Sequence, residues 1–536
     1  MTDGCGMFRN ALMAVLAVAA VLATACAAGA AGPAAGPFDG VEFTPAGTID
    51  KLVLKTLRAN KVEPARLCSD AVFLRRVHLD VIGTLPEPRT VRDFLADRRA
   101  NKRRAMIERL MAREEFADYW TQRWGDLLRI KAEFPINLWP NAVQAYSRWV
   151  HAAVRGNMPY DRFARELLTS SGSNFRVPQV NFYRAIQGKQ PSAIAAAAGL
   201  TFMGVRVEKW PEARRKGMEA FFSRVAYKCT AEWKEEIVHL DPAASGPLKA
   251  VFPDGKAVQI PPGTDPRRVF ADWLVRPEND WFTRNIVNRV WAWLLGRGIV
   301  DEPDDVRPDN PPTHPELLDH LAKELVSAKY DLRHIYRLIL NSNTYQQSPV
   351  PRSDSAKAAA LFACYPVRPM DAEVLLDALN RITGARDGYS SMIPEPFSFV
   401  PEYERTITLE DGSITSQFLE MFGRPSRDTG LYAERNSKPS KAQRLHLLNS
   451  SIVLSKISRS WRLQALTREA GKDQRKLIAI IYTTILSRPP TPAERAAVDK
   501  YVRPQGKGKR QRTASRDAVI DLVWALVNTK EFLYRH

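Results

Sequence analysis

The densest group of potentially reactive side chains lies at residues 301–309, where four aspartates and one glutamate fall within nine positions and His314 follows closely. Carboxylate oxygens are the ligands that hard cations such as Ca²⁺ prefer. Asp304, Asp305, Asp309 and His314 could therefore surround a metal ion used for hydrolysis. The run lacks the mid-loop glycine and final glutamate of an EF-hand. We favour a solvated turn paired with arginine, and keep a metal-dependent hydrolase as the alternative.

Two further sets of side chains could take part in acid–base chemistry. Asp319 stands next to His320, and a carboxylate can orient an imidazole, although an ion pair on a helix surface is the simpler interpretation. Asp371 and Glu373 are two residues apart, which predicts different faces of a helix. That spacing makes them a poor glycosidase dyad unless folding brings a distant acid opposite one of them.

The common enzyme motifs are absent from the sequence. It contains no glycine-rich phosphate loop, no His-Glu-x-x-His zinc helix and no Gly-x-Ser-x-Gly nucleophile elbow. Composition and spacing therefore name no reaction and indicate no cofactor. A role in binding or assembly is favoured over catalysis.

The elements that would position these residues are mostly helices. Apolar residues at helical spacing predict helices over 101–113, 142–154, 160–168, 193–202 and 317–326. Trp120 and Trp124 are four residues apart on one predicted face; core packing is favoured over a sugar-stacking platform. Residues 248–252 and 257–260 flank Pro-Asp-Gly-Lys, which is typical of a β-hairpin. The fold class is therefore mainly α, with one short hairpin.

Local signals set several boundaries. Capping boxes are predicted at Thr313–Glu316 and Thr491–Glu494, and a weaker one at Thr90–Asp93. A long Pro- and Gly-containing segment at 384–440 is typical of a functional or covering loop. Residues 503–516 contain six basic residues and no acid, which predicts a mobile basic loop.

The N-terminus resembles a secretory leader. An apolar stretch of Ala, Val, Leu and Gly follows Arg9 and ends in several Ala-x-Ala sites, so residues 1–32 are predicted to be a signal peptide. Lipid attachment at Cys26 and an uncleaved anchor are the alternatives. Export places the body of the protein in the periplasm, the outer envelope or the extracellular space.

The charge balance predicts an acidic partner. The 536 residues contain 78 Lys and Arg against 59 Asp and Glu, a formal net charge of +19, and a positive field concentrates polyanions. Because export separates the protein from genomic DNA, an acidic glycan or another envelope polyanion is the expected partner. A basic surface that binds nothing is the alternative, and no protein partner is indicated.

Few cysteines remain after the leader. Cys68, Cys229 and Cys364 allow at most one disulfide, and their wide separation disfavours metal chelation. A cysteine-based redox accessory is the third functional alternative, and it requires these three residues to converge.

Ordered blocks of sequence carry a family resemblance over most of the chain. The segments 73–86, 120–129 and 159–163 resemble the domain of unknown function 1549, often labelled a planctomycete cytochrome C domain. The segments 288–291, 296–298, 304–305, 314–319, 342–348, 368–373 and 445–449 resemble the domain of unknown function 1553. The resemblance implies large exported proteins abundant in planctomycete bacteria.

The departures from that family bear on function. Many relatives carry a Cys-x-x-Cys-His element before a Trp and a Phe-Phe pair, whereas here Phe202–Glu208 runs directly to Lys209-Trp210 and Phe221-Phe222. Relatives also carry cysteines before a Glu-Arg pair that is Glu434-Arg435 here. Covalent haem needs two thiols and an adjacent His, which no position supplies. We therefore predict the helical scaffold without its haem motif.

These observations predict two helical domains. The first, at 45–240, is like domain 1549; a linker with the hairpin occupies 241–264; the second, at 265–536, is like domain 1553. The candidate functional residues are Asp304, Asp305, His314, Glu316, Asp319, Asp371, Glu434 and Arg435.

Overall fold

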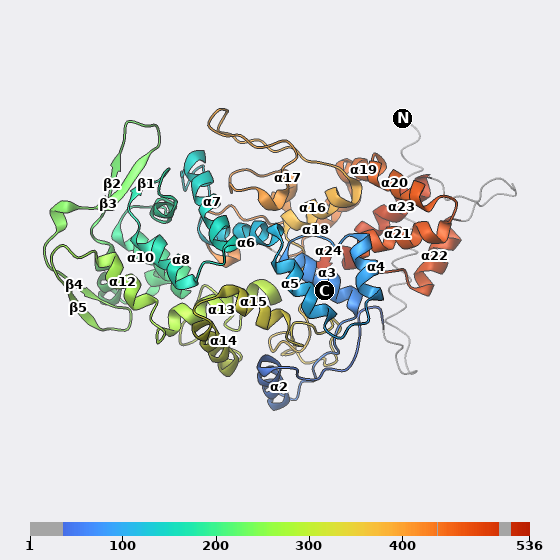
Figure 1. The fold of residues 1–536 in the computed structure, drawn as a ribbon, viewed down its shortest axis with the longest axis horizontal. Coiled ribbons are helices and arrows are strands. Elements are labelled where there is room, and N and C mark those ends of the chain that lie inside the picture. Colours follow the sequence, from blue (N-terminus) through green and yellow to red (C-terminus); the bar gives the residue numbers. More distant parts are fainter. Residues whose placement is uncertain (1–35, 437, 503–515) are drawn as a thin grey trace.

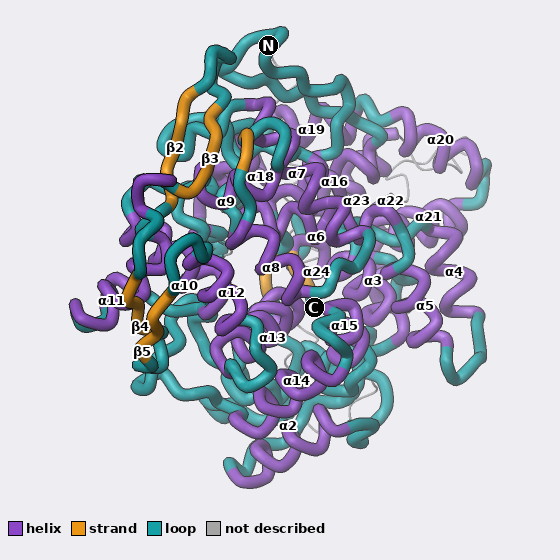
Figure 2. The backbone as a smooth tube through the Cα atoms, turned by 60° about the vertical axis from the view of Figure 1, so that its left-hand side comes forward, coloured by secondary structure: helices purple, strands orange, loops and turns teal. Residues whose placement is uncertain are grey.

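A computed structural model describes residues 36–436, 438–502 and 516–536. The predicted leader, including Cys26, lies outside the described residues, as does nearly all of the predicted basic loop. Within the described ranges the chain is mainly helical, as the sequence predicts, and the strands between residues 172 and 260 gather on one side (Figures 1 and 2).

The first half of the chain, described from residue 36 onward, contains ten α-helices and two small antiparallel sheets. The helices are α2 (Thr48–Ala59), α3 (Asp70–Val81), α4 (Pro88–Ala96), α5 (Lys102–Met111), α6 (Glu114–Leu127), α7 (Pro140–Arg155), α8 (Tyr160–Thr169), α9 (Asn181–Arg184), α10 (Pro191–Met203) and α11 (Glu212–Glu219). The strands are β1 (Gly172–Ser173), β2 (Val225–Cys229), β3 (Glu236–Leu240), β4 (Leu248–Val251) and β5 (Ala257–Ile260). Strand β3 pairs antiparallel with both β1 and β2.

The predicted hairpin is confirmed. Strands β4 and β5 pair antiparallel with Leu248 opposite Ile260, and β4 ends one residue earlier than the pattern predicts. The turn between them contains Gly255 at a φ of 88°, a left-handed conformation that glycine adopts without steric cost.

The second half is again helical and returns to the first. Its elements are α12 (Pro266–Leu274), α13 (Asp280–Leu295), α14 (Pro315–Ser327), α15 (Leu332–Leu340), β6 (Arg368–Pro369), α16 (Ala372–Thr383), α17 (Gln417–Met421), α18 (Lys441–Asn449), α19 (Ser451–Ser458), α20 (Trp461–Ala470), α21 (Gln474–Leu486), α22 (Pro492–Val502), α23 (Arg516–Val527), α24 (Lys530–Leu533) and β7 (Tyr534–Arg535). Figure 1 shows α21, near the C-terminus, beside α4, and the two helices are in contact.

One hydrophobic core joins the two halves. It runs from Ile49 in α2 to Phe532 in α24. Trp120 and Trp124 are buried in it, and both rings pack against Trp293 from α13 at 5.6 and 5.7 Å between centroids. The prediction that these two tryptophans are core residues is therefore confirmed.

Buried arginines of α3 also tie the N-terminal half to the end of the chain. Arg76 donates hydrogen bonds to the carbonyls of Tyr345, Gln347 and His536, and Arg75 donates to those of Ile485 and Phe532. Buried carbonyls without secondary-structure partners need such donors. The helix α3 thus holds segments that are more than 250 residues away in sequence.

The capping predictions have different outcomes. Thr491 and Glu494 exchange hydrogen bonds between side chains and backbone amides at 2.7 and 3.2 Å, so that box is confirmed. The box at Thr313 is wrong, because its hydroxyl donates to the carbonyl of Ile299 and α14 has no side-chain cap. The box at Thr90 is also wrong, since α4 begins at Pro88.

Candidate functional site: an arginine-lined cavity

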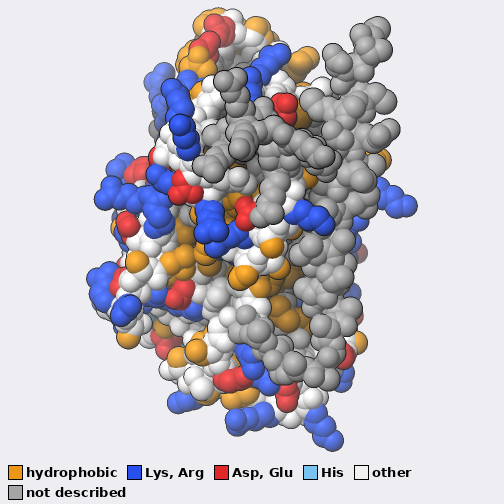
Figure 3. Space-filling model, turned by 90° about the vertical axis from the view of Figure 1, so that its right-hand side faces the viewer, with side chains coloured by type: hydrophobic (Ala, Val, Ile, Leu, Met, Phe, Trp, Pro, Cys, Tyr) orange, Lys and Arg blue, Asp and Glu red, His pale blue; other side chains and the backbone are white. Residues whose placement is uncertain are grey.

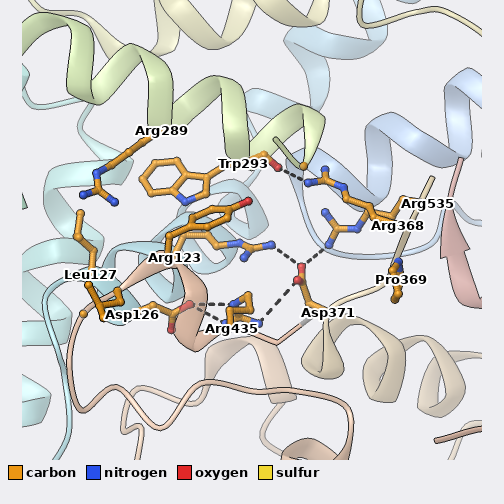
Figure 4. Close-up of a pocket in the computed structure, with 14 residues that line it drawn as sticks. Arg123, Asp126, Leu127, Arg289, Trp293, Arg368, Pro369, Asp371, Arg435 and Arg535 are labelled. Carbon is orange, nitrogen blue, oxygen red and sulfur yellow. Dashed lines mark hydrogen bonds and ion pairs between the residues drawn. The ribbon is translucent and has the colours of Figure 1, made fainter. Parts of the chain in front are cut away.

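Five separate segments of the chain meet around a cavity of about 80 Å³ (Figure 4). Helices α6 and α13, the strand pair β6–β7, the start of α16 and the loop at 430–435 each contribute side chains. The charged residues that line it are five arginines and two aspartates: Arg123, Arg289, Arg368, Arg435, Arg535, Asp126 and Asp371. We call it the arginine cavity.

Asp371 lies at the centre of the charged groups. It is the residue before the first turn of α16, and its Oδ2 accepts hydrogen bonds from Arg123 at 2.5 Å and from the hydroxyl of Tyr119 at 3.2 Å. Arg535 donates to the same oxygen. Its second oxygen, Oδ1, lies 3.8 Å from Nη1 of Arg435.

Arg435 fastens the loop at 430–435 to two helices. Its guanidinium donates to Asp126 of α6 at 2.7 and 3.0 Å and to Glu373 of α16 at 2.7 and 3.1 Å. Such two-sided contacts fix both the position and the plane of a guanidinium. Asp371 and Glu373 therefore face the same arginine, and the prediction that they lie on different faces is wrong. The spacing rule fails because Asp371 precedes the helix.

The C-terminus completes the wall of the cavity. Arg368 of β6 and Arg535 of β7 are paired across the two-stranded sheet. Both donate to Oδ1 of the buried Asp80, at 3.1 and 3.0 Å, while Oδ2 of Asp80 accepts from Tyr345 and Tyr365. This carboxylate holds the two arginines side by side.

Arginine exceeds carboxylate in the whole cluster. The lining arginines and their ion-pair partners, together with Arg424 and Arg427, comprise seven arginines against five carboxylates, those of Asp80, Asp126, Asp304, Asp371 and Glu373. Burial alone would raise the pKa of Asp371, but Arg123, Arg535 and Arg435 outweigh it and hold that pKa far below its ordinary value. Arg435 and Arg424 lower the pKa of Glu373 against the same opposing effect. Both carboxylates are therefore ionised at neutral pH. The cluster as a whole contains two more arginines than carboxylates.

Two glycines let the backbone approach this cluster. Gly296 ends α13 at a φ of 75°, and a Cβ there would lie 2.8 Å from Cδ of Arg368. Gly430 has a φ of 74°, and a Cβ there would lie 2.7 Å from both the carbonyl of Leu127 and Nη1 of Arg129. A larger residue at either position would be strained and would displace an arginine.

The acidic run and His314 do not form a site with one another. Asp304 is buried and pairs with Arg289 at 2.7 Å, whereas Asp305 and Asp309 pair with Arg307 at 3.3 and 3.4 Å. His314 is buried against Phe362, and burial lowers its pKa to about 4. Across the described ranges no group of three or more His, Cys, Asp or Glu side chains is placed to hold a metal ion. The proposed metal ligands are thus separated by their own partners.

The remaining candidates divide between this cavity and the surface. Asp371 and Arg435 line the cavity. Glu316 is exposed and pairs with Lys55, and Asp319 pairs with Arg284 at 2.9 Å. Glu434 accepts hydrogen bonds within its own loop, from Ser426, Asp428 and Thr429. Cys68, Cys229 and Cys364 are all free thiols.

Sequence reasoning missed most of the residues that line the cavity. Arg123, Asp126, Arg289 and Arg368 all lie inside the blocks that carry the family resemblance, beside residues interpreted as scaffold. Those blocks were the available signal for these four residues. Arg535 lies outside them, and only the folded chain places it next to Asp371.

The structure thus describes a mainly helical protein with an arginine-lined cavity. The family described as PSCyt2, a protein of unknown function (DUF1549), matches residues 48–209, and the family described as PSD1, a protein of unknown function (DUF1553), matches residues 266–502. The chain therefore carries a DUF1549 domain followed by a DUF1553 domain. No curated protein and no solved structure matches it. None of the helices in the described part of the chain is long and apolar enough to cross a bilayer.

Proposed function

We propose that the protein is an exported binding module of the cell envelope, and that its arginine cavity binds an acidic group of a glycan or a similar polyanion. The observation that carries this proposal is the charge of the lining, in which five arginines accompany two aspartates. Guanidinium groups bind carboxylate, sulfate and phosphate through charge-assisted hydrogen bonds. An anion entering the cavity would offset the positive excess.

Unused donors support the proposal. Among the described residues, the buried Nε–H groups of Arg368 and Arg535 have no acceptor. A buried donor without a partner costs about 1–3 kcal/mol, and an anion or a water molecule could satisfy it. The size of the cavity, about 80 Å³, suits a single acidic group better than a sugar ring.

The face drawn in Figure 3 shows no broad basic patch among the side chains that it colours. On the face drawn in Figure 3, Lys and Arg side chains are scattered among acidic and apolar ones. A net charge of +19 then serves to draw a polyanion toward the protein, and the cavity supplies the specific contact.

The test uses small anions as probes and a matched pair of variants. Leu431 is half-buried in the cavity lining. Leu431→Glu adds a negative charge there, while Leu431→Gln has nearly the same size without the charge. Titration calorimetry with sulfate and with glucuronate should detect binding to wild type and to L431Q, and a loss of about tenfold or more in L431E.

The salt dependence separates this site from non-specific attraction. Binding of dextran sulfate should weaken as salt is raised, and uncharged dextran should not be retained. Equal anion affinities in L431E and L431Q, or no salt-sensitive binding at all, would contradict the proposal.

A further inference from the structure

Three aromatic side chains from distant parts of the chain meet at the surface, away from the lining of the arginine cavity. Trp139 precedes α7, Trp233 occupies the turn between β2 and β3, and Phe397 lies in the 384–440 segment. The ring of Trp139 lies 6.5 Å from that of Trp233 and 5.7 Å from that of Phe397. In Figure 1 the tip of the β2–β3 hairpin and the long loop before α17 reach toward the same end of α7. We call these three residues the aromatic patch.

Two of the three rings of the patch are open to solvent, and Trp139 between them is half-buried. Trp233 is 67% exposed and Phe397 is 46% exposed, while the neighbouring Phe399 is 66% exposed. Large aromatic side chains usually bury their rings, so a group of exposed rings indicates an interaction surface. Lys234 lies over two of the rings, with its Nζ 5.7 Å from the centre of Trp139 and 5.3 Å from that of Trp233.

The backbone at the patch is strained. Trp139 has a φ of 73° and a ψ of 149°, a region that is almost restricted to glycine. Holding a tryptophan there costs about 1–3 kcal/mol, and such strain tends to persist at binding sites. Core packing does not account for it, because the ring of Trp139 is directed to rings that are themselves exposed.

A cavity with unused charged groups adjoins the patch. It has a volume of about 260 Å³ and is lined by Pro140, which follows Trp139, and by Phe399, two residues beyond Phe397. Arg148, Glu404 and Glu410 also line it. Within the described ranges no hydrogen bond or salt bridge engages the side chain of Arg148 or Glu410, although burial raises the pKa of Glu410 to about 7 against the opposing charge of Arg148. Their polar atoms are available to a ligand.

We propose that the aromatic patch and this adjoining cavity form a second binding site, which takes the sugar rings of a polysaccharide. The C–H face of a pyranose ring is apolar and packs on the face of an aromatic ring, whereas its hydroxyls need polar partners. The patch supplies the ring faces, and Arg148 and Glu410 supply the partners for the hydroxyls.

Two other occupants fit these groups less well. A lipid surface would have to take up the polar side chains of Arg148 and Glu410 in the cavity wall, and burying polar groups without hydrogen-bond partners is costly. An apolar peptide would leave the same two groups unsatisfied. A sugar chain pairs with both the rings and the charges.

The experiment measures retention of the full chain in native gels that contain hydroxyethyl cellulose, xylan, galactomannan or alginate. Trp233→Ala removes an exposed ring at a hairpin turn, and Phe397→Ala removes a second. Trp461→Ala is the matched control, because Trp461 is 63% exposed on α20 and is not part of the patch. At least one polysaccharide should retain wild type and W461A, and each patch variant should bind it about five- to tenfold more weakly.

The outcomes distinguish this site from the arginine cavity. L431E should bind small anions weakly but should keep its retention by a neutral polysaccharide. Retention by none of the four gels, equal retention of W233A and W461A, or patch-dependent binding to phosphatidylcholine–phosphatidylglycerol vesicles instead would overturn the inference. A failure of anion binding would leave the sugar-ring result unaffected.

Discussion

The acidic run at 301–309 and the arginine cavity are both rich in charge, yet they are built in opposite ways. In the run, neighbours in sequence pair locally, as Arg307 does with Asp305 and Asp309. In the cavity, Arg123 contacts Asp371 across 248 positions and Arg427 contacts Asp126 across 301. The pairs of Arg307 lie at the surface, whereas the cavity joins segments that would otherwise separate, and Asp304, the buried acid of the run, pairs with Arg289 of the cavity. Charge density along a sequence is therefore a poor guide to which charges carry structure.

The largest expected effect comes from the centre of the cavity. Asp371→Ala would leave Arg123 and Arg535 buried without their shared carboxylate, and breaking such a pair costs about 3–5 kcal/mol. Urea unfolding at neutral pH measures the loss. A change below about 1 kcal/mol would mean that the cavity is no more structural than the acidic run.

The fold was predictable where neighbours in sequence decide the structure. The β4–β5 hairpin follows from alternating residues around a Pro-Asp-Gly turn, and the cap at Thr491 follows from one hydroxyl and one carboxylate three residues apart. Thr313 carries the same pattern and fails, because folding brings the carbonyl of Ile299 to its hydroxyl. Tertiary contacts decide between two identical local signals.

The titration of His314 shows whether this histidine contacts the carboxylates of the acidic run. Its pKa is lowered to about 4 by burial, so the unfolded chain, with an ordinary His pKa of about 6.5, binds the extra proton first. Stability is therefore fully present above pH 6.5 and falls as the pH drops toward 4, by roughly 2–3 kcal/mol from this group.

His314→Phe removes that titration while keeping a ring against Phe362. Compared with wild type, the variant should lose less stability between pH 7 and pH 4, as measured by urea unfolding at each pH. The buried His78 and His536 titrate with the same sign in both proteins, so the difference isolates His314. Parallel pH profiles would place His314 in contact with solvent or with an acid.

The candidate site was only partly predictable. Asp371 and Arg435 could be predicted as candidate functional residues. The spacing of arginines along the sequence gives no sign that five of them converge on one cavity. Arginine is abundant in this chain, so each one alone resembles an ordinary surface residue. The signal lies in contacts between α6, α13, α16 and the C-terminus, and such contacts are not visible in a single sequence.

A smaller loss of stability is expected at the helix caps, where the prediction at Thr491 is confirmed and the one at Thr90 is wrong. Thr491→Ala removes the cap of α22 and should cost about 1 kcal/mol. Thr90→Ala is the control, because Thr90 lies inside α4 rather than before it, and alanine there should be neutral or slightly stabilising. Thermal unfolding of the two variants ranks them, and a larger loss for T90A would reverse the assignment.

The smallest effect is expected in the acidic run itself. Asp309 pairs with Arg307 at 3.4 Å, and its side chain is 73% exposed, so solvent screens most of the attraction. Asp309→Asn should change the free energy of unfolding by less than about 0.5 kcal/mol. Millimolar Ca²⁺ should raise the melting temperature of neither wild type nor variant, because four of the five acids in the run are already paired with arginine. If Ca²⁺ raises the melting temperature of wild type but not of D309N, the acidic run binds a cation and its charges are functional.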